Sequence, residues 1–382
     1  MDLNSIPRPN NSVSNTPSSD SPNSALSEIL ELQNKLVTAN IPVDLKEETM
    51  RSILRLERMA KWGNYGSEFE TVDKYVDWIT RMPWGKLTED NLDIQNAKKL
   101  MDETHYGIDT IKNLILDYLA VMQLQKARGL QKESGARDFV KAPALLFVGL
   151  QGVGKTTIAK SIAKSMGKGF ARISLGAIGD VRTIRGVPKY ELDAEPGQIV
   201  KALIRTQSMN PVILIDEIEK SSSQKGLLND VMAALLEILD PEQNASFTDH
   251  YVDYPIDLSN AFFICTANNL GGLSAALLDR LEVIRFTSYT DDEKEVIGKS
   301  YILPKVLGNI GLTTDHIQIS EEVWPLIIRP VGFDAGIRQL ERNIATLARS
   351  IAREIVEGKP LPIVVTPDNL RKYVLPDQGP LS

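Results

Sequence analysis

The stretch Gly149-Leu-Gln-Gly-Val-Gly-Lys155-Thr156 decides the fold of this chain. An apolar run, Ala144-Leu-Leu-Phe-Val148, precedes it, and a helix-forming run, Ile158-Ala-Lys-Ser-Ile-Ala-Lys164, follows it. A strand, a glycine-rich turn and a helix in this order predict a phosphate-binding loop, because the glycines let backbone N–H groups surround phosphate oxygens while the helix directs its positive end at the same anion. We therefore expect an α/β fold with a nucleotide site at this loop.

Each residue of the loop has an expected role. The backbone N–H groups of 152–157 are predicted to hold the phosphates, the Lys155 ammonium to reach the terminal phosphates, and the Thr156 hydroxyl to ligate Mg²⁺. The predicted nucleotide-binding residues of the loop are Gly149, Gly152, Val153, Gly154, Lys155, Thr156 and Thr157. The expected cofactors are accordingly ATP and Mg²⁺.

A second motif follows the loop along the chain. Val212-Ile-Leu-Ile215 is continuously apolar, as is typical of a parallel strand covered on both faces, and it ends in Asp216-Glu217. This pattern is a Walker B signature, in which Asp216 would hold Mg²⁺ and Glu217 would orient and deprotonate the attacking water. Two acids after a strand are by themselves more often an exposed turn, and it is the preceding phosphate loop that favours the catalytic interpretation.

Three further polar residues are candidates. Another apolar run, Phe262-Phe-Ile-Cys-Thr266, leads to Asn268, which is able to hold the nucleophilic water or the γ-phosphate, although a turn asparagine is the alternative. Arg280 would stabilise the γ-phosphate of a neighbouring subunit, and the alternative is a solvated surface group. Arg338 lies near the start of a predicted amphipathic helix, residues 334–356, where it would report the nucleotide state or form a surface salt bridge.

Composition excludes several classes of protein. The 382 residues are 42% hydrophobic, enough for two or three domains, and 43 basic against 50 acidic residues leave a net charge of −7 that offers no footprint for nucleic acid. One cysteine and three scattered histidines argue against a disulfide framework and against a cysteine or histidine metal site. No run approaches the ~18 apolar residues of a membrane span. The first 25 residues lack a signal-peptide core, so we expect a cytoplasmic protein.

The N-terminal third has its own pattern. Residues 1–26 are rich in Ser, Asn and Pro, which predicts a disordered tail. From residue 27 to 138 apolar residues recur mostly at helical spacing. The charged stretch Lys126–Lys141 predicts an exposed loop before the nucleotide-binding strand.

The motifs together resemble those of a known family. The phosphate loop, Ile215-Asp-Glu-Ile-Glu-Lys220, Thr266-Ala-Asn268, Leu278-Asp-Arg280 and Ala335-Gly-Ile-Arg338 stand in the order found in AAA+ ATPases. Longer segments resemble the Lon protease family in particular, over roughly residues 28–376. They are Tyr75-Val-Asp-Trp78 through Pro83-Trp84, Asp102-Glu-Thr-His-Tyr-Gly-Ile108, Tyr118-Leu-Ala-Val121, Leu235-Leu-Glu-Ile-Leu-Asp-Pro-Glu-Gln-Asn244, Phe247-Thr-Asp-His-Tyr251 and Pro255-Ile-Asp-Leu258.

The resemblance implies a fold, an assembly and further roles. It implies a helical N-terminal segment (27–138), an AAA+ P-loop αβα core with a parallel five-stranded sheet (139–287), a small helical lid (288–378) and a short tail (379–382). It also implies a homo-hexameric ring in which Arg280 is an arginine finger acting in trans. Asn268 would be sensor 1 and Arg338 sensor 2. Tyr106 and Gly107 match the family segment that lies against the adenine.

The sequence also departs from the family pattern. The chain ends at Ser382, before the family's protease domain with its Ser-Lys dyad, so we expect no peptidase site here, and a short tail stands where the family has a large N-terminal domain. The central pore loop carries Glu191-Leu192 in place of an aromatic-aliphatic pair, with Tyr190 one residue early. Leu150-Gln151 replaces the usual Pro-Pro, which should loosen the phosphate loop without removing a phosphate contact.

These observations predict a Lon-like AAA+ ATPase that hydrolyses ATP to unfold, remodel or translocate protein substrates. One form of this hypothesis adds a protease on another chain as a partner. Two alternatives stay open. The chain is a fragment or split half of an ATP-dependent Lon serine protease in protein quality control, or it is a nucleotide-binding scaffold or regulator with little turnover.

Overall fold

The structure is a computed structural model that describes residues 22–61, 66–127, 144–175, 181–220, 225–329 and 336–373. The expected tail up to residue 21 and most of the expected loop before the nucleotide-binding strand therefore lie outside the described residues. The chain divides into two compact units, Met1–Arg81 and Met82–Ser382. In the described part of the chain, no helix has the length and apolar character needed to cross a membrane.

The first unit is a group of three helices, α1 (Pro22–Thr38), α2 (Val43–Ala60) and α3 (Gly66–Arg81), which pack against one another. Their buried side chains recur at helical spacing and include Ile29, Leu32, Leu36, Leu45, Ile53, Leu56, Val76 and Ile79. Helix α1 begins at Pro22, so residues 22–26 belong to a helix and not to the tail. A proline fits there because the first turn needs no N–H donor and its φ is already helical.

The second unit contains a five-stranded parallel sheet in the order β2-β3-β6-β1-β7. The strands are β1 (Ala144–Val148), β2 (Phe170–Ser174), β3 (Val212–Asp216), β6 (Phe262–Ala267) and β7 (Leu281–Arg285). Every residue of β1, β3 and β6 is buried, which explains their continuous apolar sequences. The α/β fold class with a five-stranded parallel sheet, preceded by helices and followed by a lid, is confirmed.

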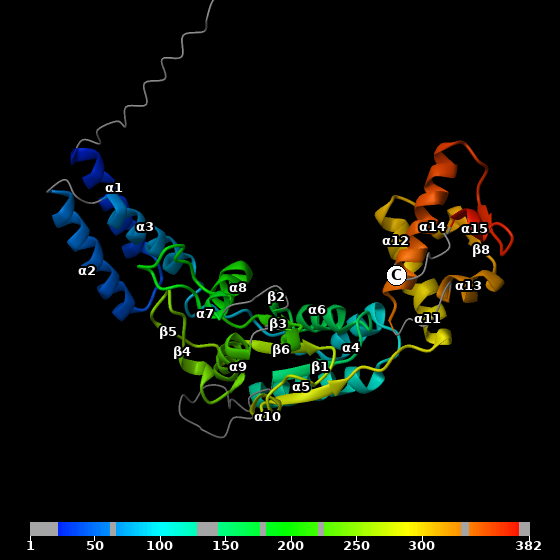
Figure 1. Cartoon of the computed structure of the whole chain (residues 1–382), viewed down its shortest axis with the longest axis horizontal. Coiled ribbons are helices and arrows are strands. Elements are labelled where there is room, and N and C mark those ends of the chain that lie inside the picture. The colour runs from blue at the N-terminus through cyan, green and yellow to red at the C-terminus, as the bar shows by residue number, and fades with distance from the viewer. Residues whose placement is uncertain are drawn as a thin grey trace, which may run out of the picture. The chain divides into compact units, whose positions relative to one another are not determined.

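Helices cover both faces of this sheet. Helix α6 (Lys155–Ser165) packs on β2, β3 and β6. The chain runs one way across the sheet from β1 to β2 and back the other way through β3 and β6 to β7, so right-handed crossovers put the later helices on the opposite face. Helix α9 (Lys225–Leu239), which connects β3 to β6, is one of these later helices (Figure 1). The remaining elements of the core are α7 (Arg182–Arg185), α8 (Gln198–Thr206), α10 (Ala275–Leu278) and a hairpin of β4 (Phe247–Thr248) and β5 (Pro255–Ile256).

Two helices from the expected N-terminal segment belong to the second unit. Helix α4 (Ile94–Thr104) packs against α6 and α5 (Asp109–Ala127). Their apolar side chains share one hydrophobic core with Leu145 and Phe147 of the sheet; they include Ala97, Met101, Ile111, Ile115 and Leu119. The division between units therefore falls after Arg81 and not at residue 138, because helical periodicity does not reveal against which partner a helix buries its apolar face.

The lid follows β7. Its elements are α11 (Asp291–Ile297), a π-helical turn (Gly298–Ile302), α12 (Leu303–Asn309), β8 (Ile317–Ile319), α13 (Trp324–Ile328), α14 (Arg338–Val356), β9 (Ile363–Val365) and α15 (Leu370–Tyr373). Helix α14 buries Leu340, Ile344, Leu347 and Ile351 on one face. The pair β8 and β9 forms a small parallel sheet, so the lid is mostly but not wholly helical.

Candidate functional site

The glycines of the phosphate loop stand where only glycine fits. The loop joins β1 to α6, and Gly152 and Gly154 have φ angles of 85° and 93°. A Cβ on Gly149 would lie 2.7 Å from the carbonyl oxygen of Phe286. Residues 149–154 therefore turn sharply enough for the chain to enter α6 at Lys155, and Thr156 and Thr157 lie in the first turn of that helix, at its positive end.

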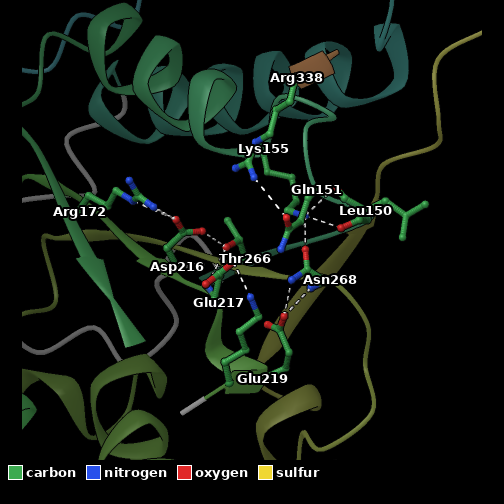
Figure 2. A network of polar contacts seen from close by, with 12 residues as sticks. Leu150, Gln151, Lys155, Arg172, Asp216, Glu217, Glu219, Thr266, Asn268 and Arg338 are labelled. Carbon is green, nitrogen blue, oxygen red and sulfur yellow. Dashed lines mark hydrogen bonds and ion pairs between the residues drawn. The ribbon is translucent and has the colours of Figure 1, made fainter. Parts of the chain in front are cut away.

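Lys155 lies across the loop (Figure 2). Its Nζ donates hydrogen bonds to the carbonyl oxygens of Gly149 and Leu150 and, at 3.2 Å, to Oδ1 of Asn268. Burial lowers the pKa of Lys155, while the carboxylates of Glu219, Asp216 and Glu217 oppose this change. The ammonium thus occupies a position from which it can exchange carbonyl partners for phosphate oxygens.

Asp216 ends β3 with both carboxylate oxygens engaged. Thr266 donates its hydroxyl to Oδ1, and Arg172 donates Nε to Oδ2 at 2.9 Å together with one of its terminal nitrogens. The Asp216 side chain is buried, whereas Arg172 is about half exposed. Arg172 comes from the neighbouring strand β2, and its guanidinium competes with any cation for Oδ2.

Glu217 is held by its backbone as well as by its side chain. Its φ is 59°, a left-handed conformation that costs a residue other than glycine on the order of 1 kcal/mol or more. The backbone N–H donates to Oγ1 of Thr266 at 3.0 Å, and Oε1 accepts from Nζ of Lys220 at 2.9 Å. The strained turn places this carboxylate just beyond the strand end, next to Asp216.

Asn268, one residue after β6, is fixed by a third carboxylate. Its Nδ2 donates to Oε1 of Glu219 at 2.6 Å, and its backbone N–H donates to the same oxygen at 3.2 Å. Figure 2 shows Asn268 between Glu219 and the phosphate loop. The structure therefore brings Lys155, Asp216, Glu217 and Asn268 to one edge of the sheet.

Sequence reasoning assigned no role to Glu219, Arg172 or the Thr266 side chain. A signal existed for Glu219, because it stands three residues after Asp216 in the motif Ile215-Asp-Glu-Ile-Glu-Lys220. The structure folds Ile218–Lys220 into a 3₁₀ turn directly after Glu217. Arg172 offered no such signal. It approaches Asp216 only because β2 and β3 are neighbours in the sheet, which the sequence does not specify.

The lid touches the phosphate loop directly. Nη1 of Arg338 donates to Oε1 of Gln151 at 3.3 Å, and the N–H of Ile337 donates to the carbonyl oxygen of Gly152 at 3.1 Å. A Cβ on Gly336 would lie 2.6 Å from the Gln151 carbonyl oxygen, so glycine permits this close approach. Arg338 is thus within the site, at the first turn of α14.

The segment around Tyr106 borders the same loop. A Cβ on Gly154 would lie 3.8 Å from Cδ2 of His105, and one on Gly107 would lie 3.5 Å from Oε1 of Glu293 in the lid. Tyr106 is exposed. His105 is buried beside Lys112, and burial lowers its pKa to about 4. The expected adenine segment therefore lies between the phosphate loop and α11.

A cavity of about 520 Å³ opens at the ends of β1, β6 and β7. Gly149, Leu150, Asn268 and Phe286 are among the residues that line it. It provides open space beside the loop and Asn268.

Arg280 lies away from this cluster. It follows α10, is about half exposed, and its Nε donates to Oδ2 of the buried Asp240 at 3.1 Å.

The 187–196 loop, between α7 and α8, is exposed at its tip. Tyr190 is 84% exposed and Leu192 90%, and Glu191 forms an ion pair with Arg182 at 3.1 Å. Its base is held by buried Asp249, which accepts hydrogen bonds from the N–H groups of Gly197, Tyr251 and Val252.

Two family models match parts of this chain. Residues 145–289 match the family of ATPases associated with various cellular activities (AAA), and residues 308–363 match the Lon protease AAA+ ATPase lid domain. The two matches cover the phosphate loop, the strand-end residues and most of the lid.

Similar chains are named Lon protease. "Lon protease 2" of Thermus thermophilus is 41% identical over 350 residues, which is 91% of this chain and 43% of that protein. Lon proteases of Lawsonia intracellularis and Roseiflexus castenholzii are 41% and 42% identical, over 91% and 88% of this chain and 40% of each relative. The chain spans about two fifths of the length of these relatives. It belongs to the Lon protease family, of which it carries the AAA+ ATPase region and the lid.

Proposed function

We propose that this chain binds ATP with Mg²⁺, hydrolyses it, and uses the cycle to unfold, remodel or translocate protein substrates. The observation that carries the proposal is the convergence of the phosphate loop, two strand-end carboxylates and Asn268 at one edge of the sheet. In open α/β sheets, this edge is where ligands bind.

The phosphate loop would bind the triphosphate. The N–H groups of 152–157 and the positive end of α6 would hold phosphate oxygens, and Lys155 would leave the carbonyl oxygens of Gly149 and Leu150 for the terminal phosphates. Tyr106 and Gly107 would lie against the adenine, and Arg338 would sense the phosphates from the lid. Thr157 would contribute its backbone N–H.

The site fits Mg²⁺. This ion takes one or two protein oxygens and completes its shell with phosphate and water, so a cage of protein ligands is not required. In the described residues no three His, Cys, Asp or Glu side chains form such a cage, while Asp216 and Thr156 supply a carboxylate and a hydroxyl. When bound, Mg²⁺ would neutralise charge on the phosphates.

Glu217 would orient the attacking water and take its proton. For this, its carboxylate must turn from Lys220, with which it forms an exposed and therefore weak ion pair. Asn268 would hold the water or the γ-phosphate in line. Arg280 from a neighbouring copy in a hexameric ring would stabilise the charge that develops during transfer.

The exposed tip of the 187–196 loop supports contact with polypeptide. Tyr190 and Leu192 offer apolar surface, and Arg182 neutralises part of the charge of Glu191. A cytoplasmic location is part of this proposal and rests on the sequence pattern alone.

Steady-state ATP hydrolysis with and without an unfolded protein such as casein tests the proposal, with Lys155→Ala as the blank. We expect turnover that casein raises. Turnover equal to that of the blank would contradict ATP hydrolysis, and turnover indifferent to casein would contradict the coupling to polypeptide and favour a scaffold.

A second function is favoured by the length of the relatives. Since the chain spans about two fifths of proteins named Lon protease, its ATPase would drive proteolysis when a Ser-Lys protease domain is joined to it or supplied by another chain. Adding such a domain in trans and following casein cleavage with ATP tests this: no ATP-dependent cleavage would count against it.

A further inference from the structure

Glu219 lies in the nucleotide site, but none of the steps proposed for ATP binding and hydrolysis uses its carboxylate. It lies in the 3₁₀ turn Ile218–Lys220, and its Oε1 accepts both N–H donors of Asn268, from the backbone at 3.2 Å and from Nδ2 at 2.6 Å. Its Oε2 is buried and has no hydrogen-bond partner among the described residues. A buried carboxylate oxygen without a donor destabilises a fold, so stability alone does not account for this residue.

The contacts of Glu219 determine how Asn268 presents its amide. With Nδ2 bound to Glu219, Oδ1 faces Lys155 at 3.2 Å, and one of the two Nδ2 hydrogens remains for a ligand. Without Glu219, the amide is able to rotate and to exchange its oxygen and nitrogen. Glu219 is also the largest of the carboxylate influences that oppose the lowering of the pKa of Lys155.

We propose that Glu219 is a positioning residue for ATP hydrolysis: it locks the amide of Asn268 so that one Nδ2 hydrogen points toward the γ-phosphate and the attacking water. The inference rests on the proposed function. Because a charged acceptor forms a stronger hydrogen bond than a neutral one, the carboxylate holds the amide more firmly than a glutamine amide does.

Three variants separate this role from a merely structural one. Glu219→Ala removes the acceptor, and we expect kcat to fall about tenfold or more with a smaller change in KM. Glu219→Gln keeps an acceptor of the same size, so kcat should fall less, while the melting temperature should stay at or above that of the wild type because the unpaired charge is gone. Glu322→Gln, an exposed glutamate of the lid, is the matched control and should leave both unchanged.

The decisive comparison is the double variant with Asn268→Ala. If Glu219 acts through Asn268, Glu219→Ala should cost little further kcat in that background, because residues in one network are not additive. Dissociation constants for ADP and for ATPγS give a readout that does not need turnover: the preference for ATPγS should fall in either single variant and fall no further in the double variant.

Several results would overturn the inference. These are a wild-type kcat in Glu219→Ala, an equal loss with and without Asn268, or a melting temperature of Glu219→Gln that falls together with its activity. If the wild-type chain binds ATPγS but does not turn over ATP, the proposal that it hydrolyses ATP is wrong. The dissociation constants for ADP and ATPγS in the variants then still decide whether Glu219 positions Asn268. If the wild-type chain binds no nucleotide at all, the proposed function and this inference both fall.

Discussion

The nucleotide edge of the sheet and the 187–196 loop hold their side chains in opposite ways. At the sheet edge, Asp216, Thr266 and Arg172 form one network with partners inside the chain. At the tip of the loop, Tyr190 and Leu192 stand in solvent, although the base of the loop is fixed by Asp249. A site for chemistry on a small ligand requires groups that are already placed, whereas a surface for polypeptide gains its contacts only when the partner arrives.

The largest effect is expected at the sheet edge. Glu217→Gln should lower ATP turnover on the order of 10²- to 10³-fold, because the amide cannot take a proton from water. Binding of ATPγS, measured by calorimetry, should persist. Glu191→Gln in the exposed loop is the matched control and should retain turnover without casein. If Glu217→Gln turned over ATP at the wild-type rate, the assignment of the base would be wrong.

A substitution at the base of the 187–196 loop should also have a large effect, in this case on stability. A Cβ on Gly197 would lie 1.9 Å from the carbonyl oxygen of Ile184. We therefore expect Gly197→Ala to lower the free energy of unfolding by about 3 kcal/mol or more, measured by urea denaturation. Gly308→Ala is the control, since a Cβ there meets no atom within 4 Å. Equal free energies of unfolding for Gly197→Ala and Gly308→Ala would contradict the conclusion that the base of the loop is closely packed.

Acid should destabilise the fold through the buried His105 beside the phosphate loop. Burial and Lys112 lower the pKa of His105 from 6.5 to about 4, so the folded chain resists protonation that the unfolded chain accepts. This contribution to stability is complete above pH 6.5 and is lost as the pH falls toward 4, by up to about 3 kcal/mol.

Unfolding free energies at several pH values between 7.5 and 4.5 check this expectation. His105→Gln should show a weaker dependence on pH than the wild type, while His250→Gln, which changes an exposed histidine, should keep the wild-type dependence. Parallel curves for wild type and His105→Gln would show that His105 does not resist protonation.

The smallest effect on stability is expected at the loop tip. Tyr190→Ala and Leu192→Ala should change the free energy of unfolding by less than about 0.5 kcal/mol, because neither side chain is buried. Both should reduce the stimulation of ATP turnover by casein while leaving basal turnover intact. Stimulation that survives the double substitution would remove the loop from the proposed function.

Much of the fold was predictable because its signals are local. The phosphate loop, the apolar strands that end at Val148 and Asp216, and the family itself were all inferred from contiguous residues, and the structure and the comparisons confirm the fold and the family. The unit boundary was not predictable in the same way. Helices α4 and α5 have the same periodicity as α1 to α3, yet they bury their apolar faces in the core of the sheet.

The sequence by itself determined which residues reach the carboxyl ends of the strands, because alternating strands and helices in a parallel sheet bring those ends to one edge. Only the tertiary structure decided what those residues touch. Glu219 meets Asn268 across 49 positions of sequence, Arg172 meets Asp216 across 44, and Asp249 meets Gly197 across 52. Such contacts depend on strand order and on the path of each turn, and no local pattern encodes them, since hydrogen bonds act over about 3 Å in space and not along the chain.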